Sequence, residues 1–278
     1  MGTTDEIILN DADSVASIAP HRGAIATKLE IAGKRVLFMD VETLRDRSSN
    51  VRGGVPVLFP TPGKLVNDAW EYAGASGSMK QHGFARNLAW RAVEKSSASV
   101  ELTLESNDET RTQFPWDFTF DMVFTLAGNS LRLEQRVTNK SATTMPYGIG
   151  FHPYFYVPDG EKATTRIATQ ARRAFDNVTK QTIELPASGI DLTQKEVDLH
   201  LLDHGSTESS LAWSGGTVTL RGSEAYTHWV VWTLAGRDFV CLEPWTCPGN
   251  ALNTGDRLLT LAPGEKRVHS LEISFTAS

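Results

Sequence analysis

Residues 117–126 of the chain, DFTFDMVFTL, alternate between polar and apolar side chains at nearly every position. Successive side chains of a β-strand point to opposite faces of the sheet, whereas an amphipathic helix needs apolar residues three or four positions apart. The stretch is therefore predicted to be a half-buried strand. Its buried face would hold Phe118, Phe120, Met122, Phe124 and Leu126.

The same alternation recurs in shorter stretches along the chain, namely SVELTLE (99–105), SLRLEQRV (130–137) and SLEISF (270–275). Turn-forming residues separate such stretches at short intervals, as in Ala127-Gly128-Asn129, Ser214-Gly215-Gly216 and Pro263-Gly264. The spacing is typical of a meandering antiparallel protein. We therefore predict an all-β fold of the large antiparallel β-sandwich type.

The remaining segments contain little that predicts a helix or a second domain. No apolar stripe at helical spacing is sustained, and the best short candidate is Lys64–Tyr72. Residues 158–210 are the most polar and irregular, so we expect them to form long loops over the sheets. Because no Pro/Gly-rich linker and no internal repeat is found, a single domain over residues 1–278 is predicted.

Composition excludes several classes of partner. The net charge is −6 and no Lys/Arg-rich block occurs, so nucleic acid is not expected to bind. Neither a signal-peptide pattern nor an apolar run of about 18 residues is found, which predicts no membrane association and a cytoplasmic location. The cysteines, Cys241 and Cys247, are too few for a disulfide framework and fit a reducing compartment.

Two stretches place an ionisable side chain directly before a proline and beside aromatic residues, GFHPYFYV (150–157) and CLEPW (241–245). A proline pushes the residue before it into an extended conformation and cannot donate to a sheet ladder. His152 and Glu243 are therefore expected near strand ends, where a sheet presents side chains at its rim. Alternation places Glu243 on the same face as Cys241, so we expect partial burial.

Partial burial raises the pKa of a carboxylic acid and lowers the pKa of an imidazole, which moves both toward neutrality. General acid-base catalysis near pH 7 requires such values. His152 and Glu243 are therefore candidates for a catalytic pair. The alternative is that His152 is a hydrogen-bonded core histidine and Glu243 an ion-paired residue at a strand end.

A third stretch, QHGFARNLAW (81–90), combines His82, a glycine that lets the backbone bend, and Arg86. A sugar hydroxyl or an anion would suit this pair, and a surface turn with a solvated arginine is the alternative. Upstream, RGGVPVLFP (52–60) joins Arg52 to two glycines and an apolar stretch. Several tryptophans accompany the expected strands, and their rings could stack on sugars or simply fill the core.

Metal and cofactor signatures are missing from the sequence. The chain has no H-E-x-x-H, C-x-x-C, G-x-S-x-G, P-loop or G-x-G-x-x-G motif, so no metal and no organic cofactor is expected. His200 and His204 lie four residues apart in a polar segment. We interpret them as solvated loop histidines rather than metal ligands.

Four of these stretches in order, RGGVPVLFPTPGKL, QHGFARNLAW, GFHPYF and LEPWTCPGNALNTGD, resemble the aldose 1-epimerase, or galactose mutarotase, family. The resemblance covers nearly the whole chain. It implies a β-supersandwich with a sugar site in a cleft on one sheet, and it needs no cofactor. It also implies that Glu243 is the general base, that His152 is the general acid, and that His82 binds and polarises the sugar.

The resemblance leaves the substrate open between a free aldohexose and its 6-phosphate. Asp203, in LLDHGS, resembles the sugar-binding aspartate of an Asp-His-x-Phe segment, although Ser206 replaces the phenylalanine. Arg52 and Arg86 resemble arginines that face the phosphate in the hexose-6-phosphate mutarotase branch, and Lys64 could add a further cation.

Three functions are compatible with these residues. The first is a mutarotase, the second is a non-catalytic carbohydrate-binding protein on the same fold, and the third is a lyase or isomerase on the same scaffold. The sugar or sugar phosphate is the expected partner of a monomer or homodimer.

Overall fold

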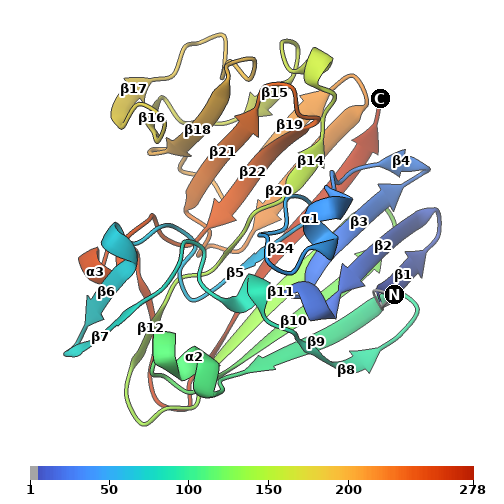
Figure 1. The fold of residues 1–278 in the computed structure, drawn as a ribbon. Coiled ribbons are helices and arrows are strands. Elements are labelled where there is room, and N and C mark those ends of the chain that lie inside the picture. Colours follow the sequence, from blue (N-terminus) through green and yellow to red (C-terminus); the bar gives the residue numbers. More distant parts are fainter. Residues whose placement is uncertain (1–5) are drawn as a thin grey trace.

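Antiparallel strands dominate the computed structural model, which describes residues 6–278 (Figure 1). One eight-stranded sheet, here called the long sheet, has the order β15-β19-β20-β24-β11-β10-β9-β8. Its strands are β8 (Arg91–Lys95), β9 (Ser99–Glu105), β10 (Phe118–Ala127), β11 (Ser130–Asn139), β15 (Arg166–Ala168), β19 (Glu208–Trp213), β20 (Gly216–Gly222) and β24 (Lys266–Ala277).

A second sheet, here called the cavity sheet, has the order β17-β16-β18-β21-β22-β13-β5, and β14 also pairs with β22. Its strands are β5 (Val57–Leu58), β13 (Gly150–Phe151), β14 (Tyr154–Tyr156), β16 (Arg173–Asp176), β17 (Gln181–Glu184), β18 (Glu196–Leu201), β21 (His228–Leu234) and β22 (Phe239–Trp245). The two sheets together confirm the prediction of a large antiparallel all-β fold.

Smaller elements complete the fold. Smaller sheets contain the remaining strands: a four-stranded sheet of β1 (Ile7–Asp11), β2 (Ser14–Ala19), β3 (Ile25–Ile31) and β4 (Lys34–Arg35), a hairpin of β6 (Ala69–Tyr72) and β7 (Ala75–Ser78), and a pair of β12 (Met145–Tyr147) and β23 (Leu259–Leu261), which are distant in the sequence. The α-helices in the described residues are α1 (Val41–Arg45), α2 (Asp108–Gln113) and α3 (Ala251–Thr254). None of the helices within residues 6–278 is long and apolar enough to cross a membrane.

Alternation in β10 produces the core face that the sequence predicts. Phe118, Phe120, Met122, Phe124 and Leu126 are all buried, and the residues between them are only partly buried. They belong to one hydrophobic cluster that also contains residues of the cavity sheet. Burying each such side chain contributes about 1.5–3 kcal/mol, so this face holds the two sheets together.

The cavity sheet has two chemically different faces, and the second one carries the site. On β22, Val240 and Leu242 belong to the main hydrophobic cluster, whereas Cys241 and Glu243 point to the opposite face. On β18 the same alternation buries Leu199 in the main cluster and leaves its polar neighbours on the other side. Period-two alternation therefore gives this sheet a polar face that is available for chemistry.

One expectation from the sequence is wrong. Residues 158–210 contain β15, β16, β17 and β18 rather than long loops alone, because these strands are too short for their alternation to stand out. Lys64–Tyr72, the best short candidate for a helix, forms a short 3-10 turn (Val66–Asp68) followed by β6. Asn67 and Asp68 have positive φ values, which a continuous right-handed helix does not allow.

Candidate functional site

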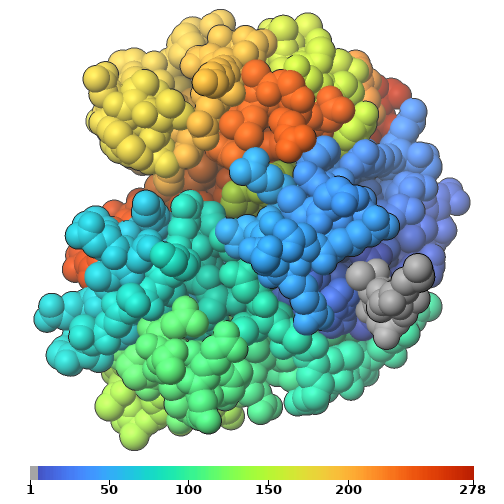
Figure 2. Space-filling model, in the orientation of Figure 1, coloured from blue at the N-terminus to red at the C-terminus, as the bar shows by residue number. Residues whose placement is uncertain are grey.

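A cavity of about 660 Å³ lies on the polar face of the cavity sheet. Figure 2 shows the molecule hollowed between the gold-coloured part of the chain, which contains β16–β18, and the cyan part, which contains residues 64–86. Five of the predicted site residues line this cavity, namely Arg52, His82, Arg86, His152 and Glu243.

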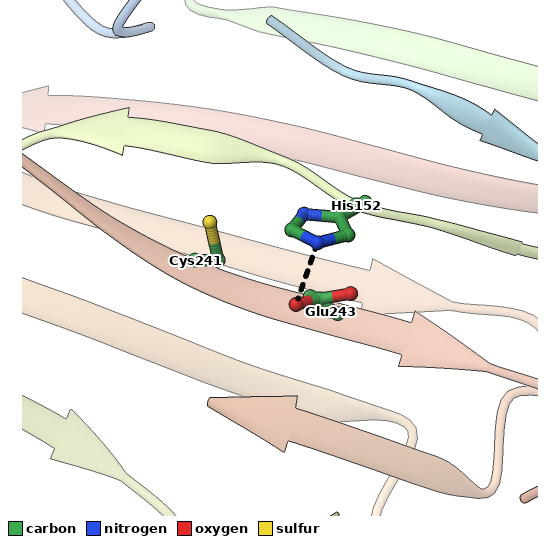
Figure 3. Close-up of side chains that lie close together, drawn as sticks. All are labelled: His152, Cys241 and Glu243. Atoms are coloured by element: carbon green, nitrogen blue, oxygen red, sulfur yellow. Dashed lines mark ion pairs between the residues drawn. The ribbon is translucent and has the colours of Figure 1, made fainter. Parts of the chain in front are cut away.

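The catalytic pair predicted from the two pre-proline stretches meets in the wall of this cavity. The Nε2 atom of His152 lies 3.3 Å from the Oε1 atom of Glu243 (Figure 3). Both residues are buried, with 8% and 1% of their surface exposed. An imidazole and a carboxyl group at this distance can exchange a proton with each other or with a small molecule that contacts both.

Strand register explains why the two side chains meet. β13 and β14 both pair with β22, with Gly150 opposite Trp245 and Tyr154 opposite Cys241. The same antiparallel register places the position of His152 opposite Glu243. His152 and Pro153 lie between β13 and β14 and belong to neither strand, because a proline cannot donate to the sheet ladder. The two flanking strands fix the position of His152.

Burial sets the charge state of the pair. Desolvation raises the pKa of Glu243 well above its usual range, and the nearby carboxylate of Asp198 raises it further. Desolvation, together with the cationic Arg86, lowers the pKa of His152 to about 3. Both shifts favour a neutral carboxyl group beside a neutral imidazole. A hydrogen bond of 3.2 Å from the indole Nε1 of Trp245 orients the other carboxyl oxygen.

His82 stands beside the pair on a sharply bent segment. Its φ is 73° and that of Gly83 is 70°, so the backbone bend that the sequence suggested at this glycine is present. The Nδ1 atom contacts the carbonyl oxygen of Pro62, which can only accept, so Nδ1 carries the proton. The His82 ring lies 5.4 Å from the His152 ring, and its unprotonated Nε2 is left to accept a hydrogen bond.

Three cationic side chains line the same cavity, Arg52, Lys64 and Arg86. Arg52 and Lys64 are exposed, whereas Arg86 is half-buried and its Nε atom has no hydrogen-bond partner in the described protein. Desolvation lowers the pKa of Arg86, although Glu243 and Tyr154 act in the opposite direction. An arginine remains charged under these conditions, so this guanidinium keeps a free donor near the catalytic pair.

Asp203 does not join the other predicted site residues. Its carboxylate accepts hydrogen bonds from the backbone amides of Arg172 and Arg173, at 3.0 and 3.1 Å, and its neighbour Leu202 lines the cavity instead. A carboxylate held in this way shapes the turn after β18. The structure therefore places it outside the residues that line the cavity.

Several cavity residues were not identified as site residues from the sequence, among them Asp198, His200 and His228, which contact one another. The interpretation of His200 and His204 as solvated loop histidines is wrong, because both are largely buried. His200 lies on β18, and His204 bonds the hydroxyl of Thr169 and the carbonyl oxygen of Glu208. The alternation of Val197, Leu199 and Leu201 is the signal that would have revealed the strand.

Aromatic residues divide between the core and the cavity. Trp232 and Trp245 line the cavity, whereas Trp90 and Trp229 are buried and donate to the backbone carbonyls of Ala85 and Ser206. Core filling thus explains the latter two. The former two could pack against the apolar face of a sugar ring.

His152, Cys241 and Glu243 form the group of metal-ligand types found in residues 6–278, with one candidate ligand atom each within 4.8 Å of the others (Figure 3). Cys241 and Cys247 are both free and buried. Burial raises the pKa of the Cys241 thiol, whereas a metal binds the thiolate. Cys241 is therefore a neutral thiol beside the pair of His152 and Glu243.

Comparison with known proteins identifies the family. The family model described as aldose 1-epimerase matches residues 6–274. The protein LacX (plasmid) of Lactococcus lactis is 30% identical over 237 residues, covering 74% of this chain and 78% of that one. A Salmonella typhimurium protein named "Putative glucose-6-phosphate 1-epimerase" is 29% identical over 178 residues, covering 63% and 55%. The solved structure of the Slr1438 protein from Synechocystis sp. PCC 6803 is 34% identical, covers 100% and 97% of the two chains, and superposes with a TM-score of 0.95. The chain therefore belongs to the aldose 1-epimerase family, whose members are isomerases acting on sugars.

Proposed function

We propose that this protein is a mutarotase that interconverts the α and β anomers of an aldohexose by acid-base ring opening and reclosure. The observation that carries the proposal is the buried pair of His152 and Glu243, whose side chains approach to 3.3 Å inside a cavity of about 660 Å³. Such a cavity accommodates one monosaccharide, and both groups line it.

In the proposed reaction Glu243, as carboxylate, takes the proton of the anomeric hydroxyl while His152, as imidazolium, gives a proton to the ring oxygen. The bond between the anomeric carbon and the ring oxygen breaks, and an open-chain aldehyde forms. Rotation about the neighbouring carbon–carbon bond and the reverse proton transfers close the ring on the other face. The number of protons on the pair is unchanged after each complete cycle.

Burial favours the proton arrangement that follows ring opening, a neutral carboxyl group beside a neutral imidazole, over the ion pair that starts it. Arg86 lowers the pKa of both groups, so it stabilises the carboxylate that takes the first proton. His82 would support the reaction by accepting a hydrogen bond from a sugar hydroxyl through its free Nε2.

The direct test is anomer exchange measured by NMR or polarimetry on freshly dissolved α-glucose and α-galactose. Wild type should equilibrate at least one of them faster than buffer. Glu243→Gln and His152→Gln should each lower kcat by about 100- to 10,000-fold, because each removes a proton-transfer group. Glu94→Gln, an exposed change on β8, is the matched control and should behave as wild type.

A non-catalytic carbohydrate-binding protein is the competing function. It would show sugar-dependent quenching of tryptophan fluorescence, through Trp232 or Trp245, without faster anomer exchange. Glu243→Gln would then leave sugar affinity nearly unchanged. Exchange at the buffer rate for every sugar and sugar phosphate would reject the mutarotase in favour of this alternative.

A hexose 6-phosphate is the second candidate substrate, favoured by the cations Arg52, Lys64 and Arg86 in the cavity lining and by the name of the Salmonella relative. A guanidinium binds a phosphate through two parallel hydrogen bonds. Arg52→Met should then raise KM about tenfold for glucose 6-phosphate and leave KM for glucose nearly unchanged. An equal effect on both substrates would mean that Arg52 does not bind phosphate.

A further inference from the structure

A chain of three side chains runs from the protein surface to the cavity, from Arg257 through His228 to His200. The Nη2 atom of Arg257 lies 3.3 Å from Nδ1 of His228, and Nε2 of His228 lies 2.8 Å from Nδ1 of His200. The guanidinium is held in place because its Nη1 donates to the carbonyl oxygen of Thr227 and its Nε donates to Asp256. His228 is buried, with 2% of its surface exposed, and His200 is partly buried.

The arginine determines the direction of every hydrogen bond in this chain. A guanidinium only donates, so Nδ1 of His228 must accept and the proton of its neutral ring must sit on Nε2. That Nε2–H donates to Nδ1 of His200, which in turn places the proton of His200 on its own Nε2. Burial lowers the pKa of both histidines, and Arg257 lowers that of His228 further, so both rings are neutral.

The last donor of the chain has no good partner within the described protein. Nε2 of His200 lies 3.6 Å from Oδ1 of Asp198, which is too long for an effective hydrogen bond. The other carboxylate oxygen of Asp198 already accepts from the amide of Asn177 at 2.7 Å. The cavity therefore contains a donor and an acceptor side by side, with side chains 16% and 21% exposed.

We propose that Arg257, acting through His228, fixes His200 as a hydrogen-bond donor, and that His200 and Asp198 together recognise one hydroxyl group of the sugar. A hydroxyl both accepts and donates, so it can accept from His200 Nε2–H while it donates to Asp198 Oδ1. A site built in this way discriminates against a sugar that lacks the hydroxyl, because donor and acceptor are then buried without partners. The proposal rests on the proposed action on a monosaccharide and adds how that sugar is selected.

Other groups near His200 are compatible with this direction. Asp198 favours a proton on the facing nitrogen, and Lys180 disfavours the second proton that would make the ring positively charged. Trp245 packs edge-on against His200 at 5.5 Å and nearly parallel to His228 at 5.7 Å, so its indole keeps both imidazoles in place. The same indole donates to Glu243, which fixes the hydroxyl-binding pair relative to the catalytic pair.

The first experiment measures which ring nitrogens carry protons, by nitrogen NMR of the histidines. Wild type should show His200 and His228 protonated on Nε2. Arg257→Met removes the donor and should let the chain reverse, with a population of His200 protonated on Nδ1. Arg257→Lys retains a cationic donor and should restore the wild-type pattern. A wild-type His200 protonated on Nδ1 would overturn the proposal.

The second experiment compares kcat/KM for glucose and for its 2-, 3-, 4- and 6-deoxy analogues, which all keep the hemiacetal, in wild type, His200→Phe and His200→Gln. His200→Phe should lower kcat/KM for glucose about tenfold or more, but should not lower it further for the one analogue that lacks the recognised hydroxyl. His200→Gln keeps an amide donor and should recover part of the loss. An equal loss for every analogue would show a merely structural role and would overturn the proposal.

These two readouts separate this proposal from the proposed function. If wild type catalyses no anomer exchange, the proposed function fails, and the same sugar panel is then titrated by tryptophan fluorescence in place of kinetics. The proton positions need no catalysis to be measured. A selective loss of one hydroxyl contact in the binding titration would still support the hydroxyl pair, and a uniform loss would still reject it.

Discussion

At the scale of single residues, the site depends on placing an ionisable group before a proline on two strands that pair with each other. Gly150 and Tyr154 are in register with Trp245 and Cys241, so His152 and Glu243 face each other across the strand pair. The buried location that makes Glu243 useful as a proton-transfer group is unfavourable for its charge. Glu243, the proposed general base, is therefore expected to lower stability.

Glu243→Gln should stabilise the protein at alkaline pH. The folded-state pKa of Glu243 is raised, so its contribution to stability is fully present below the unfolded pKa of about 4.5 and is lost as pH rises toward the folded pKa. Glutamine cannot ionise, so this loss disappears in the variant. We expect a gain of about 0.5–2 kcal/mol in the free energy of unfolding at about pH 8, measured by urea titration.

The pH dependence provides the control for this prediction. The gain should shrink as the pH is lowered toward about 4.5, because the carboxyl group then becomes protonated in the unfolded state as well. Glu94→Gln, on the exposed surface of β8, should show no such trend. A gain for Glu243→Gln that is the same at both pH values would mean that ionisation of this residue does not limit stability.

At the scale of elements, the segment that carries His82 depends on a close backbone approach. Gly83 has a φ of 70°, and a Cβ atom there would lie 2.1 Å from the carbonyl oxygen of Phe59. The amide of Phe84 donates to the same carbonyl at 3.1 Å, so the two segments cannot separate without losing a hydrogen bond. The bend at Gly83 thus fixes where His82 projects.

Gly83→Ala should lower both stability and mutarotase activity. The left-handed backbone conformation disfavours alanine by about 1–2 kcal/mol, and the clash with Phe59 adds about 1–3 kcal/mol. Gly74→Ala is the matched control, because its φ is 81° and nothing lies within 4 Å of the added Cβ. Urea unfolding and anomer exchange should show a larger loss at Gly83, and equal losses at both glycines would contradict the argument.

Long strands were predictable from the sequence and short ones were not. β10 alternates over ten residues, which exceeds what chance placement of apolar residues produces, whereas β16 and β18 span four and six residues within a polar segment. Asp198 and His200 were missed for this reason. His152 and Glu243 were predicted because a pre-proline position restricts the backbone locally. That the two side chains meet depends on the register between their strands, which neither stretch of sequence shows alone.

At the scale of the whole molecule, the histidines are buried as neutral groups. Within residues 6–278 the pKa is lowered, chiefly by burial, for His82, His152, His200, His204, His228 and His269. Four of these histidines line the cavity on the polar face of the cavity sheet. The polar cavity face therefore makes the entire fold sensitive to acid.

Stability should fall steeply as the pH drops from about 6.5 to about 5. A histidine with a lowered folded pKa contributes stability that is present above its unfolded pKa of about 6.5 and is lost as pH falls, because the unfolded chain binds the proton first. Each such residue contributes a slope of up to about 1.4 kcal/mol per pH unit, which outweighs the opposite effect of the single Glu243. Carboxylates with lowered pKa values, such as Asp46 at about 2, act only at lower pH.

Urea unfolding at several pH values should show a net uptake of several protons on unfolding, and His152→Gln should reduce that uptake by about one. Unchanged stability across this interval would show that the buried histidines can be protonated within the folded protein.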